Sequence, residues 1–76
     1  MSRFDTELDA SGLNCPLPIL KAKKALAGLS SGEVLQVIST DPGSKKDFEA
    51  FCRQTGNALL EAWEDQGRFF FVINKK

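Results

Sequence analysis

The stretch GLNCPLPIL, residues 12–20, decides where the first strand ends and where the first helix begins. Proline disfavours the α conformation in the residue before it, so Cys15 is predicted to be the N-cap and Pro16 the first helical residue. Pro16 and Pro18 have no backbone N–H, which leaves the Leu17 N–H as the donor that a capping side chain reaches. The stretch therefore predicts a thiol at the start of a helix.

Hydrophobic patterning on both sides of this stretch predicts a strand, a helix and a second strand. Residues 6–10 (TELDA) alternate polar and apolar side chains, as a half-buried strand does. From Pro16 a helix is predicted to run to a stop at Gly28. Its apolar stripe has helical spacing and consists of Ile19, Ala22, Leu26 and Leu29. Residues 33–40 are rich in β-branched side chains and are predicted to form the second strand.

The second half of the chain predicts a helix and a hairpin. A helix over about residues 44–55 ends at Gly56. Its inner face is expected to contain Phe48, Phe51, Cys52 and Thr55. Residues 58–65 and 68–74 flank a short turn that contains Gly67, which is typical of two antiparallel strands.

The order βαβαββ predicts an α+β fold, a two-layer α/β sandwich. Right-handed crossovers make the first three strands mutually parallel and the fourth antiparallel to them. Because residues 69–73 are apolar on both faces, the fourth strand is placed between the second and the third. Both helices are expected on one face of this mixed four-stranded sheet. The other face is interpreted as partly wet and shielded by long side chains, with a dimer or partner patch as the alternative.

Length, charge and composition limit the class of protein. Seventy-six residues predict one domain over residues 1–76. Ten basic and ten acidic residues cancel, so direct binding of nucleic acid or of an anionic membrane is not expected. The charged N-terminal stretch does not resemble a signal peptide, and the apolar runs are too short to span a bilayer. The protein is expected to be soluble and cytoplasmic.

The chain contains no histidine and two cysteines. Chemistry that depends on histidine, and most zinc sites, are therefore excluded, and a cytosolic setting disfavours a disulfide. A helix N-terminus favours an anion by about 0.3–1 kcal/mol, so the predicted position lowers the pKa of the Cys15 thiol by less than one unit. Cys15 is thus predicted to be a competent nucleophile. Cys52 is interpreted as a small core hydrophobe, with a second reactive thiol as the alternative.

Two further groups of residues are expected near the sulfur. The C-terminal ends of parallel strands share an edge, so the loop with Asp41 and Ser44 should lie beside Cys15. Both are predicted to cap the second helix; in the alternative, Asp41 modulates the thiol or contacts a partner. A row along the free side of the first helix is predicted to bind partner proteins, with solvated side chains as the alternative. This docking strip consists of Leu17, Leu20, Lys21 and Lys24.

The segment LDASGLNCPLPILKAKKAL, with its Cys-Pro-x-Pro motif, closely resembles the TusA family of sulfur carriers, also called SirA-like and YedF-like. The resemblance continues through GEVLQVISTDPGSKKDFEAFCRQTGNALLE and implies a two-layer βαβαββ fold. It also implies that Cys15 carries a transient persulfide, and no other cofactor is expected. Gly12, Pro16 and Pro18 are predicted to shape the helix cap at Cys15. Several family members have glutamate at the position of Leu17.

The resemblance also implies transient protein partners for a monomeric carrier. The donor would be a cysteine desulfurase or a rhodanese-like protein. The acceptors would lead to tRNA thiolation, molybdenum-cofactor enzymes or sulfur oxidation. The alternative is a non-catalytic regulatory or interaction module in which Cys15 is a structural helix cap. Nucleic-acid binding by analogy of fold is the weaker alternative, because the chain has no basic surplus.

Overall fold

The computed structural model describes residues 4–76, so residues 1–3 of the predicted domain and of the charged N-terminal stretch lie outside the described residues. The predicted βαβαββ order is confirmed. The elements are β1 (Thr6–Ala10), α1 (Leu17–Ala27), β2 (Val34–Ser39), α2 (Ser44–Thr55), β3 (Ala58–Asp65) and β4 (Arg68–Asn74).

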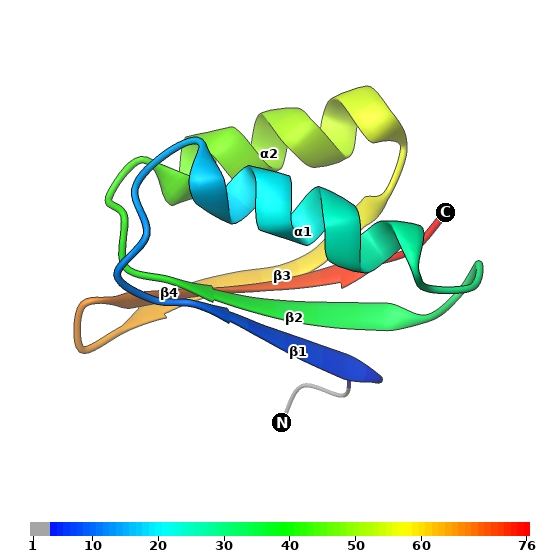
Figure 1. The fold of residues 1–76 in the computed structure, drawn as a ribbon, viewed down its shortest axis with the longest axis horizontal. Coiled ribbons are helices and arrows are strands. Elements are labelled where there is room, and N and C mark those ends of the chain that lie inside the picture. The colour runs from blue at the N-terminus through cyan, green and yellow to red at the C-terminus, as the bar shows by residue number, and fades with distance from the viewer. Residues whose placement is uncertain (1–3) are drawn as a thin grey trace.

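The four strands form one mixed sheet in the order β1-β2-β4-β3. β1 and β2 are parallel, and β4 pairs antiparallel with both β2 and β3. The predicted position of β4 in the interior of the sheet is therefore confirmed. Both helices lie on one face of the sheet, which confirms the predicted two-layer α+β fold (Figure 1). The loops that lead into α1 and α2 leave the same edge of the sheet (Figure 1).

The core lies between the two helices and the sheet. Its buried residues are Ala22, Leu26, Leu35, Val37, Phe48, Cys52, Phe71 and Ile73. The ring of Phe48 on α2 stacks on Phe71 of β4, with 4.5 Å between the ring centroids. Cys52 is 5% exposed, so the interpretation as a core residue is confirmed. Thr55 was expected on the same inner face but is exposed, and its hydroxyl donates to the Phe51 carbonyl in the last turn of α2.

Two glycines set the turns in the second half of the chain. Gly56 ends α2 with a φ of 83°, and its N–H donates to the Cys52 carbonyl. In the turn between β3 and β4, Gln66 and Gly67 have φ values of 52° and 79°. Two successive positive φ values match the right-handed twist of the strands that the turn joins. The predicted hairpin is confirmed.

The face of the sheet without helices is only partly shielded by its own side chains, and Leu60 and Trp63 of β3 remain exposed. A β-bulge between Leu59 and Glu61 shifts the register of β3, so Leu59 packs against the core while Trp63 pairs with Phe70. The Trp63 and Phe70 rings stack with their centroids 5.0 Å apart, and the Arg68 guanidinium lies over the Phe70 ring. Val72 beside them is 1% exposed. This packing agrees with a face that long side chains shield.

Among residues 4–76, neither helix combines the length and the apolar character that crossing a membrane requires.

Candidate functional site

Cys15 lies in the loop between β1 and α1, and this loop is tied to the loop after β2. The Gly12 N–H donates to the Thr40 hydroxyl over 2.8 Å. Gly12 has a φ of 81°, and a Cβ there would meet no atom within 4 Å. The backbone conformation, and not the space, is therefore what requires glycine at this position. The bond holds the two loops together at one edge of the sheet.

The structure shows that Cys15 is not the helix cap, so this prediction was wrong. The Leu20 N–H donates to the Pro16 carbonyl, which makes Pro16 the N-cap, and no side chain caps α1. The Leu17 N–H, expected to reach the sulfur, donates to the Asn14 carbonyl over 2.8 Å. A backbone turn thus satisfies this donor. The peptide bond between Cys15 and Pro16 in this turn is cis.

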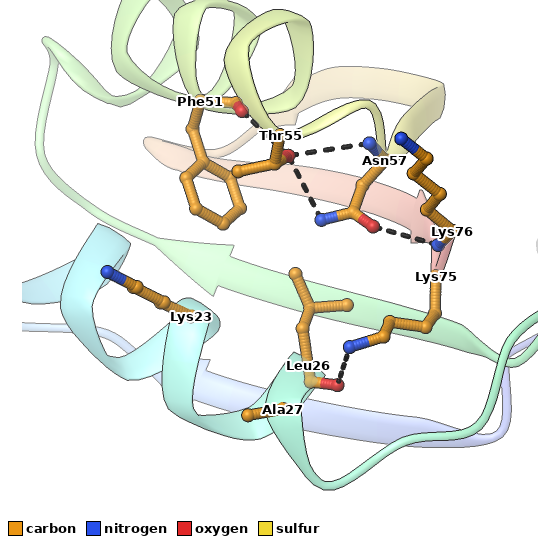
Figure 2. Close-up of a pocket in the computed structure, with 8 residues that line it drawn as sticks. All are labelled: Lys23, Leu26, Ala27, Phe51, Thr55, Asn57, Lys75 and Lys76. Atoms are coloured by element: carbon orange, nitrogen blue, oxygen red, sulfur yellow. Dashed lines mark hydrogen bonds between the residues drawn. The ribbon is translucent and has the colours of Figure 1, made fainter.

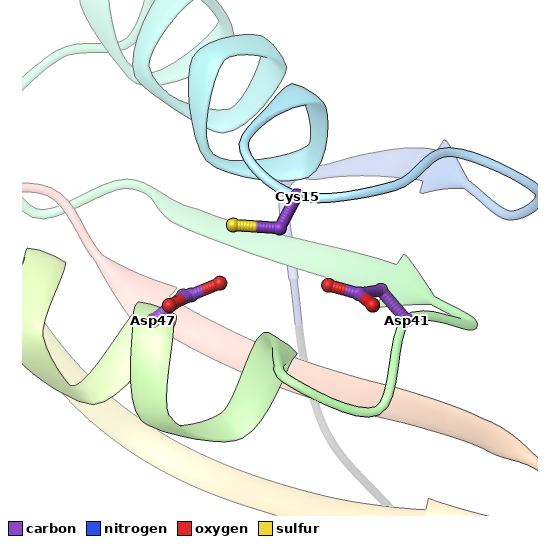
Figure 3. A group of neighbouring side chains, drawn as sticks. All are labelled: Cys15, Asp41 and Asp47. Carbon is purple, nitrogen blue, oxygen red and sulfur yellow. The ribbon is translucent and has the colours of Figure 1, made fainter.

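The Cys15 thiol points instead toward the start of α2, where two carboxylates flank it (Figure 3). Asp41 comes from the loop after β2 and Asp47 from the first turn of α2. The Cys15 Sγ and one carboxylate oxygen of each aspartate all lie within 4.8 Å of one another. The expectation that the Asp41 loop lies beside Cys15 is confirmed. We assign no cation to the cluster, since exposed acidic side chains commonly gather without one.

These carboxylates raise the pKa of the Cys15 thiol above its ordinary value. The largest cause is the hydrogen bond to Asp47, which favours the protonated sulfur. Partial loss of water contact and the negative charges of Asp47 and Asp41 act in the same direction. The expected lowering of this pKa was wrong, because Cys15 lies before the cap and because two anions lie beside the sulfur.

A pair of buried hydroxyls fixes the turn that carries the carboxylates. The hydroxyls of Ser39, the last residue of β2, and Ser44, the first of α2, hydrogen-bond to each other. The Asp41 N–H donates to the Ser39 hydroxyl, and the Ser44 N–H donates to the Asp41 carbonyl. Asp41 and Ser44 were expected to cap α2, but its N-cap is Gly43 and no side chain caps it. The Ser44 hydroxyl is already paired, which explains this difference.

Neither Ser39 nor Asp47 was predicted from the sequence to lie at this site. One signal for Asp47 was available: it lies in the first turn of a helix that begins at the same edge of the sheet as the Cys15 loop. The signal for Ser39 was a hydroxyl side chain at the end of a strand in which the other polar residue is Gln36.

A shallow groove between the two helices opens beside the thiol. Its volume is about 230 Å³, and its lining includes Cys15, Ile19, Asp47 and Phe51. A larger groove of about 480 Å³ lies at the opposite end of the helices (Figure 2). Lys75 on its wall donates to the Leu26 carbonyl near the end of α1 (Figure 2). The smaller groove is the functional candidate because the predicted nucleophile, Cys15, lines it.

The first helix presents a buried face and an exposed face beside the thiol. Pro18 in its first turn is buried, together with Ala22 and Leu26. All four residues of the docking strip are exposed; these are Leu17, Leu20, Lys21 and Lys24. Leu17 is 46% and Leu20 is 53% exposed, so the strip presents apolar surface beside its two lysines. Binding of partner proteins to this strip stays a prediction.

Comparison with known proteins gives consistent results over nearly the whole chain. The family model described as "Sulfurtransferase TusA" matches residues 6–75. A sulfur carrier protein TusA of Allochromatium vinosum is 67% identical over 99% of both chains. A putative sulfur carrier protein of Neisseria meningitidis serogroup A is 59% identical over 91% of this chain and 93% of its own.

A solved structure supports the same assignment. The crystal structure of a SirA-like protein from Desulfitobacterium hafniense superimposes with a TM-score of 0.82. It covers 92% of this chain and 96% of its own, at 30% sequence identity. At this coverage the whole βαβαββ arrangement is shared.

Proposed function

The chain belongs to the TusA family of sulfur carriers, and from this premise we propose that it carries sulfane sulfur as a persulfide on Cys15. The observation that supports Cys15 most directly is its position: an exposed thiol in a loop at the mouth of the groove between the helices. A persulfide there is open to a second protein on one side. Cys52 is buried in the core and offers no such access.

The proposed reaction is an exchange between sulfur atoms. The Cys15 thiolate attacks the outer sulfur of a donor persulfide, R–S–SH. A new bond forms between the Cys15 Sγ and that sulfur. The S–S bond of the donor breaks, and R–S⁻ leaves with its electron pair and takes up a proton. An acceptor thiolate then attacks the outer sulfur of the Cys15 persulfide, and the Cys15 thiolate leaves. The carrier returns to its starting oxidation state, so no outside oxidant or reductant is consumed.

The partners proposed for this relay are proteins. The donor is a cysteine desulfurase or a rhodanese-like protein, and the acceptor belongs to tRNA thiolation, molybdenum-cofactor or sulfur-oxidation chemistry in the cytoplasm. The proposed contact surface combines Asp41 with the docking strip. Exposed leucines beside lysines offer an apolar and a cationic contact in a row that begins two residues after Cys15.

The regulatory-module alternative depended on Cys15 as a structural cap. Because Pro16 is the N-cap and no side chain caps α1, that alternative loses its explanation for the cysteine. A backbone turn already satisfies the donor that the cap would have used.

Intact-mass measurement tests the proposal. The protein is incubated with a cysteine desulfurase and cysteine, without reductant. We expect the mass to increase by one sulfur atom, and the increase to disappear after treatment with a reducing thiol. Cys15→Ser should abolish the increase, whereas Cys52→Ala, which leaves the surface thiol in place, should retain it. An unchanged mass of the wild-type protein with an active desulfurase and an active rhodanese-like donor would contradict the proposal.

A further inference from the structure

The Asp47 carboxylate interacts with the Cys15 thiol, and the sulfur-carrier role does not explain this interaction. Its carboxylate comes from the first turn of α2, across the groove from the loop of Cys15 (Figure 3). The Cys15 Sγ lies within 4.8 Å of a carboxylate oxygen of Asp47, and the interaction with this carboxylate is the largest cause that raises the pKa of the thiol. The exposed Sγ is therefore directed at an anion that belongs to another element of the fold.

The fold holds this contact in place from both sides. The Cys15 loop is tied to the end of β2 by the bond from Gly12 to Thr40. The start of α2 is tied to β2 by the buried hydroxyls of Ser39 and Ser44. Both sides of the contact are thus anchored to the same strand.

We propose that Asp47, assisted by Asp41, is a positioning residue that keeps Cys15 protonated and directed into the groove in the free carrier. A carboxylate that accepts a hydrogen bond from a thiol stabilises the S–H form, and two anions within about 5 Å oppose a third negative charge at the sulfur. The charged groups that act on the thiol are Asp47 from α2 and Asp41 from the loop after β2. Both act in the same direction.

The consequence is a carrier whose empty form reacts slowly with small electrophiles and oxidants. The thiolate is the nucleophile in such reactions, so a smaller thiolate fraction slows all of them. The same carboxylates oppose attack on a donor persulfide, because the thiol must first lose its proton; this proton balances the one that the R–S⁻ leaving group takes up. A donor protein that brings a cationic side chain to the two carboxylates would remove this opposition at the moment of transfer. The inference rests on the proposed sulfur-carrier function for its purpose, but the control of the thiol can be measured without any sulfur donor.

The test is the rate of alkylation of Cys15 by iodoacetamide as a function of pH, read from the peptide that contains Cys15. Asp47→Asn keeps the size of the side chain but removes its charge. We expect the midpoint of the profile to move to lower pH and the rate at pH 7 to rise several-fold, since one pKa unit changes the thiolate fraction about tenfold. Asp41→Asn should move the midpoint in the same direction by a smaller amount, because only its charge acts on the thiol.

Glu49→Gln is the matched control: it removes the same charge from an exposed position on α2 that is not among the groups acting on Cys15. Its profile should coincide with that of the wild-type protein. A midpoint that stays in place or rises in Asp47→Asn would overturn the proposal, as would an equal shift in Glu49→Gln. Circular dichroism checks the fold of each variant; should Asp47→Asn not fold, the Asp41→Asn profile decides, with an unshifted midpoint counting against the proposal.

The two proposals fail independently. Alkylation needs no sulfur donor, so an unshifted profile would refute the role of Asp47 and leave the mass increase on Cys15 to be judged separately. A missing mass increase would refute the persulfide carrier and leave the measured pH profile valid.

Discussion

The two cysteines of the chain lie in surroundings that restrain a thiol in different ways. Cys15 is exposed in a loop, and the pKa of its thiol is raised mainly by a hydrogen bond to Asp47. Cys52 is buried on the inner face of α2, and the pKa of its thiol is raised by that burial. A cationic side chain of a docking partner would offset the effect of the carboxylates on the pKa of Cys15. The second restraint is part of the core and changes only when the core opens.

This difference supports Cys15, and not Cys52, as the thiol that carries sulfur in the proposed function. A thiol held by solvent-accessible carboxylates responds to what approaches it, since surface charges are open to neutralisation and screening. A thiol among Phe48, Phe71 and Leu35 has neither water nor a partner at hand. Position in the fold, and not the direction of the pKa shift, separates the exposed cysteine of the proposed function from the buried one in the core.

The largest effect on stability is expected at Cys52. Cys52→Ser places a hydroxyl in the apolar core without a designed partner, and we expect it to lower the free energy of unfolding by about 1–3 kcal/mol. Cys15→Ser changes an exposed loop side chain and should stay within about 0.5 kcal/mol of the wild-type value. Chemical denaturation under reducing conditions measures both. A larger loss of unfolding free energy in Cys15→Ser than in Cys52→Ser would contradict the assignment of Cys15 to an exposed loop and of Cys52 to the core.

A smaller effect, on the transfer rate alone, is expected at the docking strip. Leu20→Glu combined with Lys24→Glu reverses the apolar and cationic character of the exposed side of α1 and should slow sulfur transfer from a protein donor several-fold. The fold should be retained, because both residues are exposed. Alkylation of Cys15 by a small uncharged reagent needs no docking and should continue at a similar rate. Single-turnover transfer and alkylation, measured side by side, separate a damaged interface from a damaged thiol.

The control for the strip is Lys23→Glu, an exposed residue of the same helix that lines the groove at the opposite end. It should leave both rates nearly unchanged. Unchanged transfer from the donor in the double variant would exclude the strip from that step and direct attention to the loop that carries Asp41.

The fold was predictable because its signals are local and mutually consistent. Three local patterns each predicted one element: the alternation in residues 6–10, the helical spacing after Pro16 and the glycine turn of the hairpin. The handedness of βαβ connections then fixed the relative directions of the strands. The apolar run of residues 69–73 then placed β4 inside the sheet. The bulge in β3 escaped prediction because both Leu59 and Leu60 fit an alternating pattern, and only cross-strand pairing with β4 decides between them.

The place of the proposed nucleophile in the fold was predictable from the sequence, but the charges around it were not. The motif around Cys15 marks the sulfur, whereas the charge beside it depends on how two loops meet at one edge of the sheet. Asp41 was placed there by topology, and its side chain was assigned to a cap that the structure does not form. The contact with Asp47 arises from the direction of a thiol across the groove between two helices, and sequence spacing carries no information about that direction.

The smallest expected effect is a dependence of stability on pH that belongs to Cys52. Burial raises the pKa of its thiol in the folded protein above the ordinary value that it regains in the unfolded chain. The folded state therefore binds this proton more tightly, and the contribution to stability is fully present below the unfolded pKa, near ~8.5. It is lost as the pH rises through the higher folded value.

We expect the free energy of unfolding to fall above about pH 8.5, where the unfolded thiol ionises, and to fall less steeply in Cys52→Ala, which has no thiol to ionise there. Denaturant unfolding of both proteins at a series of pH values measures the difference in slope, in which the lysines and other shared groups cancel. Equal slopes would show that the burial of Cys52 does not govern its ionisation. The proposed difference between Cys52, restrained by burial, and Cys15, restrained by carboxylates, would then be contradicted.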